Sequence, residues 1–369
     1  MTEKWLTGPR DIQFYTRTYV PSSGSSPRAI IARAIIVFIH GFQEHVGRYS
    51  HFHPSLADRG IAVWTFDQAG FGRTALDKEK RSKKSSWGKT GWSDQLQDVD
   101  WAVKTARTTF PGVPVFLMGH SMGGGEVLSF VTQQSSQYTE TIASLAGVIA
   151  TSPLIKQTTP ASKLARWLGG KVAAISPYTL IPASLDVNDL SHSPESNKAH
   201  ANDPLIKTTG SLRCLSEMLN EGENLLSNGH NHWPKKLPVV LIHGDADKIT
   251  SLAATQTFYE RIEADDKNII VYPDGYHELQ NELPEVRQKL VDDIVSFVEA
   301  RAPVRSERQS SIPTDAFGRQ LSDSNDGAAN TVPSLTTGSS APASPSEMEI
   351  PPPPDAEEGP EGQKAAAKL

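Results

Sequence analysis

The sequence predicts an α/β domain over residues 1–302, built on a mostly parallel sheet that is flanked by helices. Short β-branched runs alternate with helical patterns along this part of the chain, an order typical of strands joined by crossover helices. The expected core strands are residues 34–39, 61–66, 113–118, 146–151, 237–243 and 268–272, with an edge strand near 12–20. The expected helices include residues 93–108, 122–133 and 284–300. A chain of 369 residues is long enough to bury a large core around such a sheet.

The charge and cysteine content exclude several classes of protein. Asp and Glu outnumber Lys and Arg by 42 to 36, and the formal charge of -6 argues against a nucleic-acid partner. The single cysteine, Cys214, allows no internal disulfide, so the fold does not depend on an oxidising compartment. The first residues lack the apolar stretch of a secretory signal, and no window is long and apolar enough to span a bilayer. We therefore expect a cytoplasmic protein with at most peripheral membrane contact.

Residues 153–233 interrupt the alternation of strands and helices, because they contain no clear strand and several Pro, Ser and Asn residues of the kind that favour turns and loops. We expect an inserted helical cap there. Its apolar residues recur at helical spacing, with cations on the remaining surface. The apolar stripe consists of Leu164, Trp167, Leu168, Val172 and Ile175, and the cations are Lys163, Arg166 and Lys171. Two interpretations stay open, a lid helix that rests on a lipid interface and a cap helix whose stripe packs over the domain.

The composition changes at about residue 303. Residues 303–369 hold 10 of the 26 prolines and a single aromatic residue, Phe317, so this segment cannot bury enough apolar surface to offset the entropy of ordering it. We expect a disordered tail. It ends in Ala367-Lys368-Leu369, a close variant of the Ser-Lys-Leu tripeptide that is read as a peroxisomal import signal. The sequence alone leaves two possibilities open: the tripeptide directs import into peroxisomes, or the tail has no targeting function.

A nucleophile is expected at Ser121. An apolar run is followed by Gly119-His120-Ser121-Met122-Gly123 and then by a helical pattern, which is a GxSxG motif at a strand-to-helix turn. At such a sharp turn, side chains on the flanking positions would clash with neighbouring backbone, so glycine is required there. The turn holds the serine hydroxyl out over the sheet. The motif and its flanking strand and helix predict the α/β-hydrolase fold.

The acid and the base should follow the serine in the order Asp or Glu, then His, because this fold places them on loops after later strands. His277 lies just past an expected strand and has no rival among the 11 histidines. The acid should follow the run 239–242, where Asp247 is favoured and Asp245 is the alternative. In the alternative, Asp247 only caps the helix that begins near Thr250. A buried carboxylate fixes the imidazole tautomer, so that the histidine can deprotonate the serine during attack.

Acyl transfer also requires backbone N–H groups that point at the developing oxyanion. Met122, the residue after the nucleophile, should supply one of them. The other should come from Phe42, because Gly41 after an early strand lets the backbone turn so that the Phe42 N–H faces the Ser121 oxygen. The histidine pairs elsewhere are too isolated for a metal site, and we expect neither metal nor cofactor.

Three motifs follow one another along the chain. They are His40-Gly41-Phe42-Gln43-Glu44-His45-Val46-Gly47-Arg48-Tyr49, Gly119-His120-Ser121-Met122-Gly123-Gly124 and Tyr276-His277-Glu278-Leu279. Together they resemble the monoacylglycerol lipase family of serine hydrolases, and the resemblance spans about residues 10–300. It implies Ser121, Asp247 and His277 as catalytic triad, with Phe42 and Met122 as oxyanion donors. It also implies a lipid ester as substrate, cleaved through an acyl-enzyme by a cytosolic enzyme that visits lipid droplets and membranes.

The resemblance also concerns the glycerol pocket. Glu44 and Arg48 fall where the family places polar groups around it, and the alternative is an internal ion pair that pins their loop. His200 stands where animal members have a tyrosine that helps to hold glycerol, and Gln280 stands where they have a second histidine. The activity implied is hydrolysis of monoacylglycerol. A lysophospholipase, another carboxylesterase, a thioesterase, an aminopeptidase and a non-catalytic binding scaffold are the alternatives.

Overall fold

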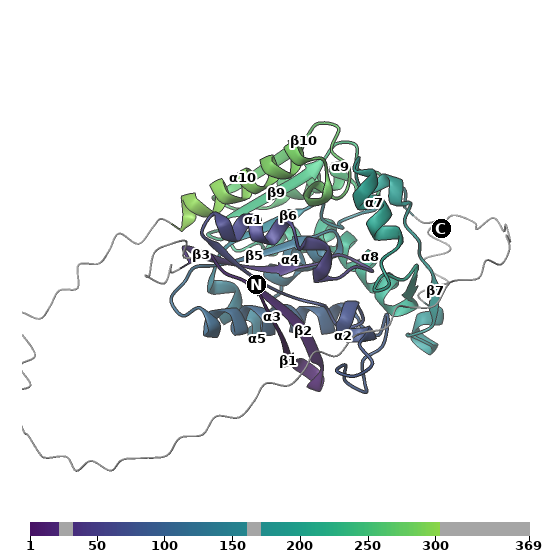
Figure 1. The fold of residues 1–369 in the computed structure, drawn as a ribbon. Coiled ribbons are helices and arrows are strands. Elements are labelled where there is room, and N and C mark those ends of the chain that lie inside the picture. The colour runs from purple at the N-terminus through teal and green to yellow at the C-terminus, as the bar shows by residue number, and fades with distance from the viewer. Residues whose placement is uncertain (22–31, 161–170, 303–369) are drawn as a thin grey trace, which may run out of the picture. The chain divides into compact units, whose positions relative to one another are not determined.

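The computed structural model describes residues 1–21, 32–160 and 171–302. Within these ranges, eight strands form one sheet in the order β1-β2-β4-β3-β5-β6-β9-β10 (Figure 1). The strands are β1 (Thr2–Thr7), β2 (Gln13–Tyr19), β3 (Ala34–Ile39), β4 (Ile61–Phe66), β5 (Val115–His120), β6 (Leu145–Thr151), β9 (Val239–Gly244) and β10 (Lys267–Tyr272). The pairs β1–β2 and β2–β4 are antiparallel and the other pairs are parallel. The sheet is therefore mostly parallel, as expected.

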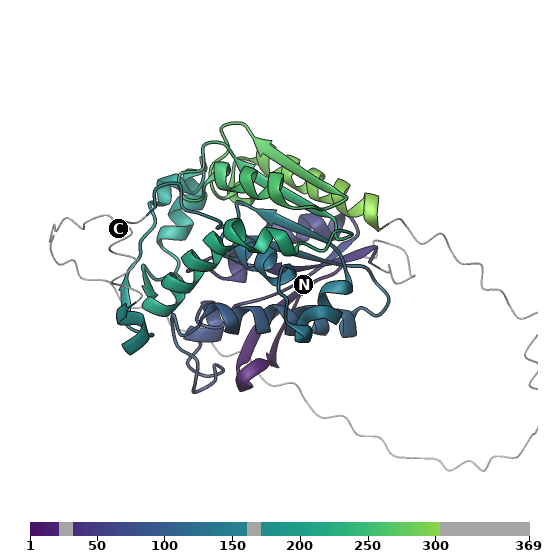
Figure 2. The same cartoon turned by 180° about the vertical axis from the view of Figure 1, so that it is seen from behind.

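Helices cover both faces of this sheet (Figures 1 and 2). In β3, Ile35 and Val37 pack on one face, while Ile36 and Phe38 pack on the other, which explains why the central strands are continuous apolar runs. The first face is covered by α3 (Trp92–Thr109), α4 (Met122–Val131), α5 (Ser136–Ala143), α8 (Leu212–Ser227) and α9 (Leu252–Arg261), and the second by α1 (Phe52–Asp58) and α10 (Pro284–Arg301). The carboxyl ends of the parallel strands meet at one edge of the sheet, where the candidate site residues lie.

The segment between β6 and β9 contains two short strands, which corrects the expectation that residues 153–233 hold no strand. Strand β7 (Leu180–Pro182) pairs antiparallel with β8 (Thr209–Ser211). Each has three residues, and together they include a proline, a glycine and a serine, so no alternating β-branched pattern reveals them. Helix α7 (Pro194–Ala201) lies between the two strands in the chain, and α8 follows β8 directly.

Three strands of the main sheet also differ from the sequence prediction by more than one residue: β1, β5, and β9, which begins at Val239 and not at 237. Strand β1 was not expected, because it lies at the sheet edge and its mostly exposed side chains show no apolar alternation. Strand β5 begins and ends two residues later than expected. Gly119 and His120 still pair with Ala150 and Thr151 of β6, so the ladder continues into the GxSxG motif and ends directly before Ser121.

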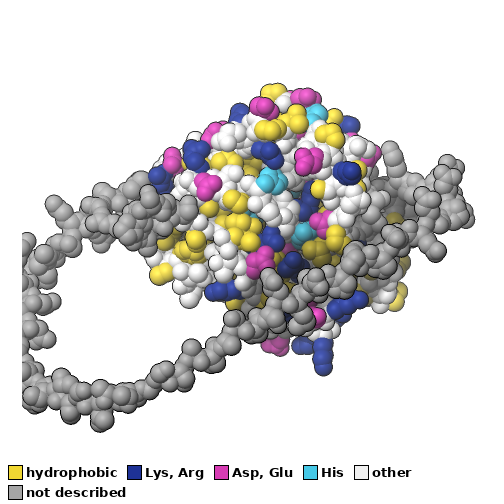
Figure 3. All heavy atoms as spheres, in the orientation of Figure 1, with side chains coloured by type: hydrophobic (Ala, Val, Ile, Leu, Met, Phe, Trp, Pro, Cys, Tyr) yellow, Lys and Arg dark blue, Asp and Glu magenta, His cyan; other side chains and the backbone are white. Residues whose placement is uncertain are grey.

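Several expectations fall outside the described residues. They concern the tail 303–369 with its terminal Ala367-Lys368-Leu369, and Leu164, Trp167 and Leu168 of the apolar stripe. The other two stripe residues, Val172 and Ile175, are described, and their exposed fractions are 49% and 88%. No helix in the described ranges is long and apolar enough to cross a membrane. On the face shown in Figure 3, Lys and Arg side chains are interspersed with Asp and Glu.

Candidate active site

Ser121 occupies a strained turn between β5 and α4. Its φ of 55° and ψ of -120° lie in a region that side-chain-bearing residues rarely adopt. The neighbouring glycines are required by close backbone contacts. A Cβ on Gly119 would lie 2.1 Å from the carbonyl oxygen of Gly123, and a Cβ on Gly123 would lie 2.3 Å from the carbonyl oxygen of Ile39. The GxSxG spacing therefore reflects the packing of the turn against β3 as well as its own curvature.

The structure brings Ser121, His277 and Asp247 into one hydrogen-bonded triad. The Ser121 hydroxyl lies 3.0 Å from His277 Nε2, and His277 Nδ1 lies 2.8 Å from Asp247 Oδ2. The acid therefore fixes the tautomer in which Nδ1 carries the proton and donates a hydrogen bond to the carboxylate, while Nε2 accepts a hydrogen bond from the serine hydroxyl. Ser121 directly follows β5, Asp247 lies on the loop after β9, and His277 lies on the loop after β10.

Asp247 is held as a buried carboxylate by four further groups. Its Oδ1 accepts from the Ile249 and Thr250 amides at 2.7 and 2.9 Å, and its Oδ2 accepts from the Thr250 hydroxyl at 2.8 Å. His243 Nε2 lies 3.2 Å from Oδ2. Burial alone would raise the pKa of Asp247, but His277 and His243, through charge and hydrogen bonding, hold the pKa well below its usual range. The alternative acid, Asp245, is exposed and accepts a bond from the Asp274 amide instead.

His277 is a stronger base than a buried imidazole without a partner. Burial by itself would lower the pKa of His277, but the charge and hydrogen bond of Asp247, with Glu278 and Glu44 nearby, raise it above its ordinary value. The neighbouring His120 lies with its ring centroid 4.9 Å from that of His277. Burial and the charge of His277 lower the pKa of His120 to about 3, so His120 stays neutral.

The loop after β3 approaches the nucleophile closely. A Cβ on Gly41 would lie 3.0 Å from the Ser121 Cβ and 2.7 Å from Glu44 Oε1. The Gly41 amide donates to that Glu44 oxygen at 2.5 Å, which fixes the course of the loop. In the part of the chain that the structure describes, the amides of Phe42 and Met122 donate to no protein acceptor. Both are therefore free to bind a ligand oxygen beside Ser121.

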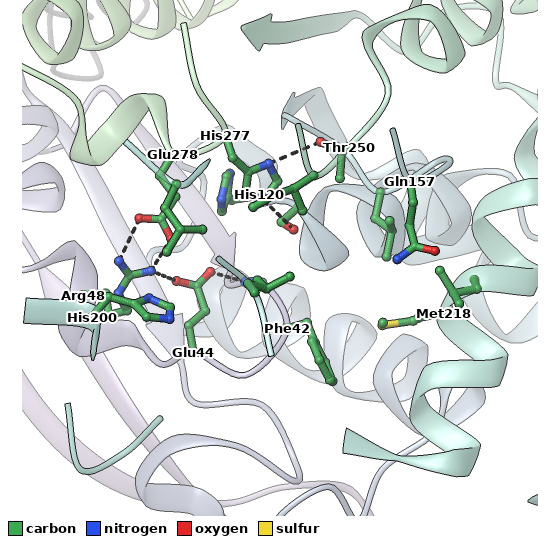
Figure 4. Close-up of a pocket in the computed structure, with 17 residues that line it drawn as sticks. Phe42, Glu44, Arg48, His120, Gln157, His200, Met218, Thr250, His277 and Glu278 are labelled. Carbon is green, nitrogen blue, oxygen red and sulfur yellow. Dashed lines mark hydrogen bonds and ion pairs between the residues drawn. The ribbon is translucent and has the colours of Figure 1, made fainter. Parts of the chain in front are cut away.

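Three charged residues form a buried cluster next to the triad (Figure 4). Arg48 Nη1 lies 3.0 Å from Glu44 Oε2, and Arg48 Nη2 lies 2.7 Å from Glu278 Oε2. A second bond joins Arg48 Nη1 to Glu278 Oε1. The Tyr49 hydroxyl donates to Glu44 Oε1 at 2.5 Å. The sequence analysis left two interpretations of Glu44 and Arg48 open. The internal ion pair is present, and both residues also line the pocket.

Glu278 was missed as a site residue by the sequence analysis, although it directly follows His277. Its contact with Arg48 joins residues 230 positions apart in the chain, and no local pattern reveals such a partner. Burial would raise the pKa of Glu278, but the Arg48 charge and its hydrogen bonds hold it far below the usual range. The cluster therefore contains one cation and the ionised Glu278, which ties the loop that carries the base to the loop after β3.

The triad opens into a pocket with a polar end and an apolar end (Figure 4). Glu44, Arg48, His200 and Glu278 form the polar end. The apolar side chains are Phe42, Leu154, Leu185, Leu190, Met218, Leu219 and Ile249, and the amide side chain of Gln157 also lines the pocket. Most of these come from the segment between β6 and β9, including α8, and the sequence analysis did not identify them because apolar residues on a cap helix look like ordinary core positions.

His200 and Gln280 have different places. His200 extends from α7 to the polar end, and its buried Nδ1 has no partner among the described residues. Burial and the nearby Arg48 charge lower the pKa of His200, which favours the neutral ring. Gln280 is buried in a short turn, its carbonyl accepts from His51, and it lies outside the residues that line this pocket. Of the two substitutions, only His200 can contact a ligand in the pocket.

A serine hydroxyl on a strained strand-to-helix turn, bonded to a histidine that a buried aspartate orients, defines a serine hydrolase of the α/β-hydrolase fold. A family model described as serine aminopeptidase, S33, matches residues 31–284. The chain belongs to the monoglyceride lipase family of these serine hydrolases, as its motifs implied.

The relatives that support this assignment come from several organisms. The chain is 33% identical over 286 residues to a Schizosaccharomyces pombe protein named as a candidate monoglyceride lipase, over 76% of this chain and 72% of that protein. It is 28% identical to the Homo sapiens monoglyceride lipase, over 73% of this chain and 83% of that protein. A solved structure of a soluble variant of the Saccharomyces cerevisiae monoglyceride lipase with a substrate analog, at 23% identity, has a TM-score of 0.71 and covers 82% of this chain and 95% of that chain. The α/β-hydrolase fold is thereby confirmed.

Proposed function

We propose that this protein hydrolyses the ester bond of monoacylglycerol to a fatty acid and glycerol through an acyl-enzyme on Ser121. The observation that carries the proposal is the position of the Ser121–His277–Asp247 triad between a polar and an apolar end of one pocket. An ester with a small polyol on one side and a long acyl chain on the other matches this division. The names of the similar proteins support the same substrate.

In the first half of the reaction, His277 Nε2 takes the proton of the Ser121 hydroxyl while the Ser121 oxygen attacks the ester carbonyl. The amides of Phe42 and Met122 donate to the oxyanion of the tetrahedral intermediate. When that intermediate collapses, the carbon–oxygen bond to glycerol breaks and His277 gives its proton to the departing alkoxide. Asp247 stabilises the imidazolium during both steps.

In the second half, water hydrolyses the acyl-enzyme. His277 removes a proton from the water, whose oxygen attacks the acyl carbonyl within the same oxyanion site. Collapse releases the fatty acid, and the proton on His277 returns to the Ser121 oxygen. The raised pKa of His277 suits this repeated role as acceptor and donor, and no metal or cofactor takes part in the sequence of steps.

The head group and the acyl chain are assigned to opposite ends of the pocket. Glu44, Arg48 and His200 offer hydrogen-bonding groups to the glycerol hydroxyls, while Leu154 and Met218 contact the acyl chain. The neutral ring of His200 has an unpartnered Nδ1, so it can bond a hydroxyl without breaking a protein contact. His200 is therefore the pocket residue whose replacement should alter head-group preference with the least effect on the ion pairs.

A head-group panel with one fixed acyl chain tests this proposal. We expect the highest kcat/KM for 1-oleoylglycerol, compared with lysophosphatidylcholine, methyl oleate and oleoyl-coenzyme A. The variant His200→Phe should lose about fivefold in kcat/KM on 1-oleoylglycerol, the effect of one hydrogen bond of about 1 kcal/mol, and should leave methyl oleate unchanged. The matched control His200→Tyr supplies a hydroxyl as the hydrogen-bonding group in place of the ring nitrogen and should retain the preference. A higher kcat/KM for lysophosphatidylcholine or for the thioester would show that lysophospholipids or acyl thioesters, and not monoacylglycerols, are the substrate class.

We also propose that the edge of the cap docks on a lipid surface. Four large apolar side chains are exposed in residues 172–180: Val172 (49%), Ile175 (88%), Tyr178 (41%) and Leu180 (45%). Cations accompany them, because Lys89 Nζ lies 5.7 Å from the centre of the Tyr178 ring and Arg213 Nη1 lies 3.1 Å from its hydroxyl. Exposed apolar groups with flanking cations are the features by which peripheral proteins bind an interface.

The double variant Val172→Ser with Ile175→Ser tests this docking surface. Each side chain gains about 1.5–3 kcal/mol when fully buried, so partial insertion predicts about a tenfold loss on emulsified long-chain substrate. Hydrolysis of a soluble short-chain ester should stay unchanged. The control is Val20→Ser, which removes a 50% exposed valine that follows β2 beside the beginning of β4, at the opposite end of the strands from the site. Equal losses on both substrates would show that the two residues serve the fold only.

A further inference from the structure

A buried carboxylate lies on the segment that carries the catalytic histidine. Glu282 comes five residues after His277, directly after the short helical turn Leu279–Asn281 and just before α10. Its exposed fraction is 2%. A carboxylate at such a depth is costly unless hydrogen-bond donors surround it, so its partners show what it holds in place.

Four N–H groups donate to the Glu282 carboxylate, two to each oxygen. Oε1 accepts from the Tyr276 amide at 3.3 Å and from Nδ1 of the His192 ring at 3.0 Å. Oε2 accepts from the His192 amide at 3.2 Å and from the Leu283 amide at 3.3 Å. Since an ionised carboxylate only accepts hydrogen bonds, Nδ1 of His192 carries a proton. The two oxygens offer about four acceptor sites, and this arrangement uses all of them.

These bonds join segments that are distant in the chain. Tyr276 directly precedes the catalytic histidine, whereas His192 belongs to the cap and lies 90 positions before Glu282. The His192 ring also packs against the Tyr276 ring, with 3.7 Å between the ring centroids. Only the bond from Leu283 is local, so capping of α10 does not account for the whole set of contacts.

The peptide group between Gly275 and Tyr276 is held at both of its polar atoms. Its N–H donates to Glu282, and its carbonyl oxygen, that of Gly275, accepts from the Ala246 amide at 3.1 Å. Ala246 directly precedes the catalytic acid. A planar peptide group that is bonded on both sides cannot rotate without losing a hydrogen bond, so the direction in which the backbone enters His277 is fixed.

The cap supports the same segment at two further points. The Glu278 amide donates to the Leu190 carbonyl oxygen at 2.8 Å, and the Ser191 hydroxyl donates to the Asn281 carbonyl oxygen at 2.8 Å. These bonds lie after the histidine in the chain. Glu282 adds the contact that lies before it, and residues on both sides of the histidine are therefore tied to the cap.

We propose that Glu282 is a positioning residue for the catalytic base, because its carboxylate holds the peptide before His277 and ties it to the cap. The His277 ring has to lie 3.0 Å from the Ser121 hydroxyl and 2.8 Å from Asp247 at the same time. A small displacement of its backbone therefore weakens both bonds. The inference rests on the ester hydrolysis proposed above, but any ester that the enzyme cleaves is suitable for testing it.

Two substitutions of Glu282 test the positioning role on a soluble short-chain ester. Glu282→Gln keeps the size, but its NH2 group faces two N–H donors in either orientation. Glu282→Asp keeps the charge, but it is shorter by one methylene group and cannot reach all of the donors. A misplacement of about 1 Å can cost about a hundredfold in rate, and the remaining Ala246 bond limits the displacement. We expect kcat per active site to fall about tenfold in Glu282→Gln and about threefold in Glu282→Asp, with KM within about twofold.

The pH dependence of kcat/KM separates positioning from a purely structural role. The charge and hydrogen bond of Asp247 raise the pKa of His277, and a displaced ring loses part of this effect. The acidic limb of the profile, where His277 gains its proton, should therefore move to lower pH in both variants. Glu282→Gln also removes a charge, so Glu282→Asp is the decisive comparison. The other titratable groups close to His277 are unchanged in both variants: Glu44, Glu278 and His120.

The matched control is Glu285→Gln, which removes an exposed carboxylate from the first turn of α10, three residues after Glu282. It should keep the native kcat, KM and pH profile. A folded Glu282→Asp protein that keeps the native kcat per active site or the native acidic limb would overturn the proposal, even if its thermal midpoint is lower. Failure of both Glu282 variants to fold would do the same, because it would assign the carboxylate to the fold alone.

The result on the short-chain ester does not depend on the natural head group. If the head-group panel rejects monoacylglycerol while both Glu282 variants lose kcat and shift the acidic limb, the proposed substrate fails and the role of Glu282 stands. If the panel succeeds while Glu282→Asp behaves as the native protein, the substrate stands and the role of Glu282 fails.

Discussion

Replacing Ser121 with alanine is expected to lower kcat by about a million-fold, by analogy with the nucleophile of another serine hydrolase. The Ser121 oxygen forms the covalent bond to the acyl group, and no other hydroxyl lies 3.0 Å from His277 Nε2 in the described part of the chain. The oxyanion amides and the pocket remain in the variant, so a residual rate above that of uncatalysed hydrolysis should persist. Initial rates on a soluble ester and on 1-oleoylglycerol measure the effect.

The fold should be unaffected by this change, because alanine removes one oxygen and keeps the Cβ. The thermal midpoint and the circular dichroism spectrum should match those of the native protein. Ser136→Ala is the matched control, since Ser136 is exposed on α5 and touches none of the triad residues. A Ser121→Ala protein that retains more than about a thousandth of native kcat would rule out a covalent route through this residue.

Replacing Asp247 with asparagine is expected to cost about ten-thousandfold in kcat, less than loss of the nucleophile. The amide of asparagine can donate to His277 Nδ1, which moves the ring proton to Nε2 and prevents that atom from accepting the serine proton. Asparagine keeps the size of the side chain, and KM should change little. The loss should appear in single-turnover acylation as well as in steady-state kcat.

Asp245 provides the matched control for this prediction, because it lies two residues away on the same loop. Its carboxylate is exposed and caps the Asp274 amide, so Asp245→Asn should stay within about twofold of native kcat, as for other surface changes. If Asp245→Asn is the crippling change and Asp247→Asn is mild, the assignment of the acid is wrong.

Much of the fold follows from local chemistry in the sequence. Strands β3 and β4 have the predicted bounds because both are buried on both faces and read as uninterrupted apolar runs. The positions of Ser121, Asp247 and His277 are predictable because each lies on the segment that follows a strand of the parallel part of the sheet, and the carboxyl ends of such strands meet at one edge. The glycines of the turn are predictable for a similar reason, since the backbone contacts that exclude a Cβ are a property of the turn itself.

The remaining features depend on contacts between distant residues. Glu278 is a site residue because it bonds to Arg48, which lies 230 positions earlier in the chain. The apolar end of the pocket is assembled from the cap, where residues such as Met218 have no periodicity that separates pocket from core. The two three-residue strands of the cap carry too little local pattern to be predicted.

The central claim is that Ser121 is the residue acylated during ester hydrolysis, and active-site labelling with a fluorophosphonate tests it most directly. The labelled protein is digested, and the modified peptide is identified by mass spectrometry while residual hydrolysis of 1-oleoylglycerol is measured on the same sample. We predict one adduct per chain on the peptide that contains Ser121, with hydrolysis lost in proportion to labelling. An adduct on another residue, or full hydrolysis after complete labelling of Ser121, would contradict the account.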